Sequence, residues 1–149
     1  MHILDSLGGP SNYYYIFWQT DTITCFQEIK YYYPDMIIRN RMKRINNSDI
    51  FPLTITYFDS IKSEEFLPFI MKSNFNGIDA YSPLTPIHKG YNSLSIHSKN
   101  EIIYKEFEDY YLRESIGSEY PNLNYPYNNN TKLMLVWNKL SEQIKNEMY

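Results

Sequence analysis

The sequence lacks most of the features on which disulfide-linked, membrane-spanning and secreted proteins depend. Its 149 residues include a single cysteine, Cys25, which cannot form an internal disulfide and therefore favours a reducing compartment. No apolar run approaches the roughly 20 residues that are needed to cross a bilayer. The N-terminus has neither the basic start nor the apolar segment of a signal peptide. These absences predict a cytoplasmic protein, and the length predicts one domain over residues 1–149.

Alanine and valine are almost absent as well. The chain has one of each, Ala80 and Val136, beside 18 isoleucines, 16 tyrosines and 15 asparagines. Every alanine or valine codon contains G or C, whereas isoleucine, tyrosine and asparagine have codons made mostly of A and T. The bias indicates an AT-rich gene, as in an AT-rich bacterial genome or a mobile cassette. Such a gene raises the tyrosine content without requiring a binding role for the tyrosines.

Motifs for phosphate and metal binding are also missing from the sequence. The segment Gly8-Gly9-Pro10 does not have the glycine spacing of a phosphate-binding loop. There is no His-x-x-x-His, no cysteine pair and no acidic run of calcium-binding spacing. Cys25 falls on the expected core face of a strand, which favours a buried thiol over a nucleophile. We therefore expect no cofactor and no metal site.

Two internal histidines, His88 and His97, leave one enzymatic alternative open. With one imidazole as base and the other as acid, and Lys89 nearby, they could cleave a phosphodiester without a metal. Their nine-residue spacing matches no recognised motif, so structural or solvated roles are favoured. A small metal-independent nuclease or toxin domain is therefore the alternative to a binding protein.

The most aromatic stretch, residues 12–33, predicts a hairpin. Its strands are expected to turn at Thr20-Asp21, with Trp18 opposite Ile23. The face expected to form the core carries Tyr14, Ile16, Trp18, Ile23, Cys25 and Ile29. The other face carries Tyr13, Tyr15, Phe17, Thr24, Phe26 and Glu28. This second face is amphipathic, and we expect the C-terminal helices to cover it as a second core layer.

The middle of the chain is less clearly patterned. Residues 22–33 also fit a helix, because short apolar runs are ambiguous, and residues 36–45 fit either a third strand or a short helix. Alternation over residues 53–58 predicts a further strand. The other expected elements are a short helix starting at Ser63, loops over residues 74–91, and a strand over residues 93–97 with Leu94 and Ile96 inward.

Two helices are predicted toward the C-terminus. Ser98 followed by Glu101 is a capping box and predicts a helix over residues 98–115. Two acid-to-base pairs four residues apart support this helix, Glu101–Lys105 and Asp109–Arg113. After a loop over residues 119–130, Thr131 caps a last helix, residues 131–148, with an apolar stripe of Leu133, Val136, Trp137, Leu140, Ile144 and Met148. The expected fold is α+β, with an N-terminal antiparallel sheet of three or four strands packed by these helices.

The net charge of −3 is distributed unevenly along the chain. Residues 36–45 carry a local charge of +4, from Arg39, Arg41, Lys43 and Arg44. Four positive charges are few for a nucleic-acid footprint and equally fit a strand edge protected by charge. A nucleic-acid-binding module is therefore a third hypothesis. Residues 101–119 carry a local charge of −4.

The acidic segment is the predicted partner-binding surface. Tyrosine buries a large rigid surface at low entropic cost and keeps a hydroxyl, so it is favoured at protein interfaces. Glu106 and Glu114 border the apolar side of the expected helix, and the rim is favoured over an acid–base role for both. The predicted partner-binding residues are Glu101, Tyr104, Glu108, Asp109, Glu119 and Tyr120.

The leading functional hypothesis is a small, non-enzymatic binding protein that neutralises a partner protein. Its concrete form is a bacterial immunity or antitoxin-like inhibitor of a basic toxin. An acidic, tyrosine-rich surface suits such a partner, because complementary charge speeds encounter and rejects wrong partners.

Overall fold

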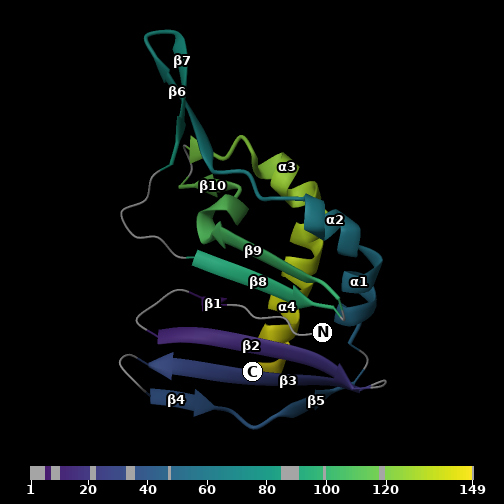
Figure 1. Cartoon of the computed structure of the whole chain (residues 1–149). Coiled ribbons are helices and arrows are strands. Elements are labelled where there is room, and N and C mark those ends of the chain that lie inside the picture. Colours follow the sequence, from purple (N-terminus) through teal and green to yellow (C-terminus); the bar gives the residue numbers. More distant parts are fainter. Residues whose placement is uncertain are drawn as a thin grey trace.

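The computed structural model describes residues 6–7, 11–20, 23–32, 36–46, 48–84, 91–98, 100–117 and 120–148. Over these residues the chain has the expected α+β fold (Figure 1). The strands of two hairpins lie beside one another, and α4 (Lys132–Met148) crosses behind them. None of the helices in this described part is long and apolar enough to cross a membrane.

The N-terminal sheet is antiparallel and is built on the expected hairpin. Its order is β1-β2-β3-β4, with β5 also paired to β3. Thr20 lies opposite Ile23, and Trp18 opposite Cys25, so the predicted register is wrong by two residues. A two-residue shift leaves every side chain on its face, because side chains alternate with a period of two. The strands are β1 (Ser6–Leu7), β2 (Ser11–Thr20), β3 (Ile23–Tyr32), β4 (Met36–Arg39) and β5 (Lys43–Ile45).

The helical alternatives for this region are wrong. Residues 23–32 form one side of the hairpin, and the segment after them forms two short strands instead of one. The connection between the two short strands stays attached to the sheet, because the backbone N–H of Asn40 donates to the carbonyl of Glu28 at 3.0 Å.

The buried face of the β2–β3 hairpin is the one that was expected to be secondary. Phe17 and Phe26 are buried with their ring centroids 4.9 Å apart, and they belong to one core cluster with Trp137 of α4. On the face expected to form the core, Trp18 is only half-buried and Ile23 is 42 % exposed. The expectation that helices cover the Phe17 face is confirmed. The choice of the opposite face as the main core is wrong, because α4 packs on the face with the larger buried aromatic surface.

A second hairpin joins β8 (Tyr91–His97) to β9 (Ile102–Glu108). The strand expected over residues 93–97 is confirmed, with Leu94 and Ile96 buried. The helix expected over residues 98–115 is wrong, because its first half is β9 and only the short 3-10 turn η1 (Asp109–Leu112) follows. Side chains four residues apart share a face in a strand as well as in a helix, so the apolar spacing did not separate the two.

Residues expected to form a strand at 53–58 form helices instead. These are α1 (Ile50–Thr56) and α2 (Phe58–Ser63). Ile50 and Thr54 are buried one helical turn apart, and the Thr54 hydroxyl donates to the Ile50 carbonyl at 2.7 Å. This back-bond satisfies a hydroxyl that a buried strand would have to pair elsewhere. The helix expected to begin at Ser63 is also wrong, because Ser63 ends α2 and residues 64–69 are irregular.

A third hairpin replaces part of the loop expected over residues 74–91. It consists of β6 (Ile70–Phe75) and β7 (Ile78–Pro83), joined by Asn76 and Gly77. Both turn residues have positive φ, 52° and 82°, as a type I′ turn requires. The Asn-Gly pair is a strong sequence signal for this turn and could have predicted it. The hairpin projects from one end of the molecule (Figure 1).

The C-terminal part matches the prediction at its last helix and differs before it. The predicted loop over residues 119–130 contains α3 (Tyr125–Asn130), preceded by the short pair β10 (Ser115–Ile116) and β11 (Tyr120–Pro121). Thr131 caps α4 as expected, since its Oγ1 accepts the N–H of Met134 at 3.0 Å. The predicted apolar stripe of α4 is buried except at Met148, which is 38 % exposed.

Candidate partner-binding site

Strand β9 presents two unlike faces, since side chains alternate along a strand. Ile103 and Phe107 point into the core and are buried. Tyr104 and Glu106 point outward, and Tyr104 is 59 % exposed. The acidic, aromatic surface that was expected on a helix therefore lies on the outer face of a strand.

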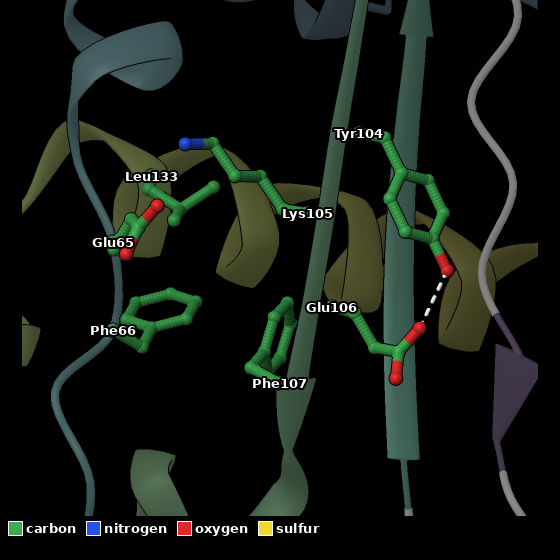
Figure 2. Close-up of a pocket in the computed structure, with 7 residues that line it drawn as sticks. All are labelled: Glu65, Phe66, Tyr104, Lys105, Glu106, Phe107 and Leu133. Carbon is green, nitrogen blue, oxygen red and sulfur yellow. Dashed lines mark hydrogen bonds between the residues drawn. The ribbon is translucent and has the colours of Figure 1, made fainter.

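Tyr104 is held in place by its neighbour on the same face. Its hydroxyl donates to Oε2 of Glu106 at 2.7 Å (Figure 2). This hydrogen bond to a carboxylate raises the pKa of Tyr104, with smaller contributions from burial and from the charge of Glu106. A hydrogen bond with Ser93 acts in the opposite direction. The ring is thus a fixed, exposed aromatic group carrying a protonated hydroxyl beside a negative charge.

A small cavity of about 150 Å³ adjoins this strand. Figure 2 shows Lys105 and Phe107 on one side of β9, toward Phe66, and Tyr104 and Glu106 on the other. Lys105 Nζ donates to the backbone carbonyls of Lys62 and Glu64 at 2.9 and 2.7 Å, so this cation satisfies the C-terminal end of α2. The cavity is lined by Glu65, Phe66, Tyr104, Lys105, Glu106, Phe107 and Leu133.

The wall behind the cavity is packed aromatic core. Phe107 makes edge contacts with Phe66 and Trp137, at centroid distances of 4.7 and 4.8 Å. The N-terminal end of α4 is fixed beside it, because the Glu64 carboxylate accepts the N–H of Leu133 at 2.8 Å. The outer face of β9 is therefore supported by side chains whose positions are set by packing and by hydrogen bonds.

The five predicted partner-binding residues that the structure describes do not all lie on one element or one face. Glu101 precedes β9 and pairs with Lys62, so the expected Glu101–Lys105 pair is wrong. Asp109 pairs with Arg113 at 2.7 Å, as expected from their spacing. Glu119 lies outside the described residues. Of the rest, Tyr104 and Glu108 share the outward face of β9, whereas Tyr120, which is exposed, lies on β11 in a separate two-stranded sheet.

Glu106 was not selected from the sequence, although it orients Tyr104. On the expected helix it bordered the apolar side, together with Glu114. The structure places both side chains in solvent. The period-two pattern of residues 102–107, with Ile103, Lys105 and Phe107 alternating with more exposed side chains, is the signal that could have identified Glu106.

The histidines and the cysteine form no nucleophilic set in the described part of the chain. His88 lies outside that part. The Nε2 of His97 is 2.8 Å from the Oγ of Ser95, on the outward face of β8. Cys25 is buried, as expected. Among the described residues, no group of three or more His, Cys, Asp or Glu side chains is arranged to hold a metal ion.

The basic segment is exposed from Arg39 to Arg44. Lys43 Nζ donates to the backbone carbonyl of Glu147, which ties the sheet edge to the last turn of α4. Nearby, Glu28 is buried: Asn40 donates to its Oε2, and its Oε1 lies 3.5 Å from Lys30 Nζ. Two residues of the segment that was considered for phosphate binding, Asn40 and Lys43, therefore make contacts that hold the fold together.

Comparison with models of known protein families, with curated protein sequences and with solved structures yields no significant match for this chain.

Proposed function

We propose that this chain is a small non-enzymatic binding protein that neutralises a partner protein, in the manner of a bacterial immunity or antitoxin-like inhibitor of a basic toxin. The partner docks on the outer face of β9. The observation that carries the proposal is Tyr104, an exposed ring fixed by its hydrogen bond to Glu106.

Preorganisation is the physical reason that Tyr104 suits an interface. An exposed tyrosine that must be immobilised on binding loses side-chain entropy, and this loss subtracts from the affinity. The Glu106 carboxylate orients the ring through its hydrogen bond before the partner arrives, and the packing around Phe107 supports the opposite face of the same strand. Tyrosines in such positions are enriched among the few residues that dominate binding energy.

The charge around Tyr104 suits a basic partner. Glu106 is exposed beside the ring and Glu108 lies on the same face of β9. An arginine or lysine of the partner could lie over the ring and against the Glu106 carboxylate, combining a cation–π contact with a charge-assisted hydrogen bond. Binding should therefore weaken as the salt concentration rises, mainly through slower association.

The test measures binding of the purified chain to the products of the genes beside its own, starting with any large toxin that has a basic domain. We expect a sub-micromolar complex that Tyr104→Ala weakens about 30-fold or more, the effect of losing a dominant interface residue. Tyr104→Phe keeps the ring and loses the bond to Glu106, so its effect should be smaller. Tyr127→Ala removes another exposed tyrosine, on α3, and serves as the control.

Two results would contradict the proposal. One is the absence of sub-micromolar binding to any protein of the gene neighbourhood. The other is nucleic-acid cleavage by the purified chain that disappears when His88 and His97 are both replaced by alanine, which would establish the enzymatic alternative.

A further inference from the structure

The N-terminal sheet has one face that α4 does not cover. Figure 1 shows α4 behind the strands, and no described helix is drawn in front of β2 to β5. The side chains on this uncovered face alternate along the strands with the buried Phe17 and Phe26. We call this surface the open face, and it carries Tyr14, Trp18, Cys25, Ile29, Arg39 and Arg44.

The open face carries the same arrangement of side chains twice. Each cross-strand row has an aromatic residue on β2, a residue of β3 in the middle and an arginine on β4 or β5. The rows are Trp18–Cys25–Arg44 and Tyr14–Ile29–Arg39. They are four residues apart along β3, or roughly 13 Å, and in each row the arginine is two strand spacings, roughly 10 Å, from the aromatic residue. The face therefore has a line of rings beside a parallel line of cations.

The rings and the arginines of these rows are available to a ligand. Tyr14 and Trp18 are half-buried, and Arg39 and Arg44 are exposed. Within the described part of the chain, neither arginine side chain has a hydrogen bond or an ion pair, and neither ring has a ring contact. A ligand can therefore reach these four side chains without breaking an existing interaction.

Charge selects an anionic ligand for the open face. Among the described strand residues of this face, the two arginines are the only charged ones. Lys43 lies on the opposite face, where it donates to the carbonyl of Glu147. Glu106 and Glu108 are on β9, on the far side of β8 and β1 from the arginines (Figure 1). Salt largely screens charges more than about 10 Å apart, so these acids do not cancel the attraction.

We propose that the open face binds single-stranded nucleic acid. Unpaired bases stack on Tyr14 and Trp18, and phosphates of the same strand lie against Arg39 and Arg44. Aromatic side chains on a sheet stack unpaired bases, and cations beside them follow the phosphate backbone, in proteins that bind single strands with little sequence preference. An acidic peptide would match the arginines but would leave the two rings without bases to stack on. This surface is separate from Tyr104 on β9, so the failure of one proposal leaves the other standing.

Tryptophan fluorescence tests the contact between bases and rings. Titration with an oligouridylate of about 10 nucleotides should quench Trp18, with a dissociation constant on the order of 10 µM. Trp137 is buried in the core and should not respond, so Trp18→Ala should abolish the quenching. Tyr14→Ala keeps Trp18 as the probe and should weaken binding about 5-fold or more, the effect of losing one stacked base.

Salt dependence tests the contact between phosphates and arginines. Two phosphate contacts predict a slope of about −1.4 when the logarithm of the association constant is plotted against that of the salt concentration. Arg39→Gln and Arg44→Gln should each reduce the size of this slope by about 0.7. Arg41→Gln is the matched control and should leave the slope unchanged, because Arg41 is exposed in the same segment but lines a groove beside Glu147.

Three outcomes would overturn the proposal. The first is no quenching of Trp18 at an oligouridylate concentration of about 1 mM. The second is equally tight binding of a polyglutamate of the same length, which would show that the face recognises negative charge without bases. The third is an equal change of slope in Arg41→Gln and in the two open-face arginine variants. The arginines are exposed, so these variants keep the salt test decisive even if Trp18→Ala does not fold.

Discussion

Replacing Asn128 with alanine is expected to cause one of the largest losses of stability that a single substitution can cause in this protein. Asn128 lies in α3 and is 0 % exposed. Its side chain donates to the carbonyls of Leu67 and Tyr111, both at 2.9 Å, and accepts the N–H of Leu67 at 2.8 Å. One amide therefore joins α3 to the irregular segment before β6 and to the end of η1.

The size of the loss in the free energy of unfolding depends on which hydrogen-bonding groups keep a partner after Asn128 is replaced. The Tyr111 carbonyl keeps a second donor, Nδ2 of Asn122, at 3.3 Å. Leu67 loses the partners that Asn128 supplies to its N–H and to its carbonyl, in two hydrogen bonds that are partly buried. A buried polar group without a partner costs about 1–3 kcal/mol, and the lower half of this range applies to partly buried groups, so the two Leu67 groups together give a loss of about 3 kcal/mol in the free energy of unfolding.

Urea unfolding followed by circular dichroism measures this loss. With a slope of roughly 1.5 kcal/mol per molar urea, the midpoint should fall by about 2 M. Asn129→Ala is the matched control, because Asn129 is the next residue of the same helix and is exposed. It should shift the midpoint by less than about 0.3 M, as surface substitutions do.

The outcome that would refute this reasoning is a midpoint for Asn128→Ala within about 0.5 M of the wild type. Water would then hydrogen-bond to the N–H and carbonyl of Leu67, and the hydrogen bonds of Asn128 would contribute little to stability. Because Leu67 directly follows Phe66 of the β9 cavity, the same variant should also loosen that wall. Faster amide exchange at residues 65–67 is the additional readout.

Three further predictions concern single contacts. Thr131→Ala removes the cap of α4 and should cost about 1 kcal/mol in urea unfolding, whereas Thr131→Ser should keep most of the stability. Gly77→Ala places a side chain at a φ of 82°, which L residues rarely adopt. Amide exchange in the β6–β7 hairpin should therefore accelerate about 5- to 30-fold while core amides stay unchanged. The hydrogen bond from Lys72 lowers the pKa of Asp79. The ion pair therefore stabilises the β6–β7 hairpin fully at a pH above the ordinary carboxyl pKa, and this stabilisation is lost as the pH falls through the lowered pKa. Lys72→Met should return that pKa toward 3.8 in a carboxyl NMR titration.

Local patterns predicted those elements whose signal has a single interpretation. The last helix combines a cap at Thr131 with an apolar stripe that runs for more than three turns, and only a helix satisfies both. The strand around Leu94 and Ile96 alternates strictly between apolar and polar residues, which a helix would place on all sides.

The wrong predictions arose where a pattern fits two structures. Residues 53–58 alternate, yet this segment is helical, and the buried side chains of α1 are Ile50, Phe51 and Thr54. In the segment after Ser98, the spacing of Ile103 and Phe107 fits a strand as well as a helix. Ser98 was expected to cap a helix. Its N–H donates instead to the carbonyl of Glu101 at 2.9 Å and closes the β8–β9 turn.

At the candidate site, too, the sequence predicted one part and missed another. Tyr104 and the acids near it were selected for their residue types, which a change from helix to strand does not alter. The hydrogen bond from Tyr104 to Glu106 was not foreseen, because residues two apart share a face only in a strand. The described members of the group predicted from the sequence therefore lie on different elements, and Tyr104 with Glu106 defines the proposed surface.

The sequence by itself determined that residues 12–33 fold back as a hairpin and which side chains share each of its faces. Both follow from the period of two, which a shift in register by two residues leaves intact. Only the tertiary structure decided which face is the core. Both faces are aromatic, so burial depended on where α4 packs, and it packs against Phe17 and Phe26. Local patterning places side chains relative to their own strand, whereas burial depends on elements more than a hundred residues away.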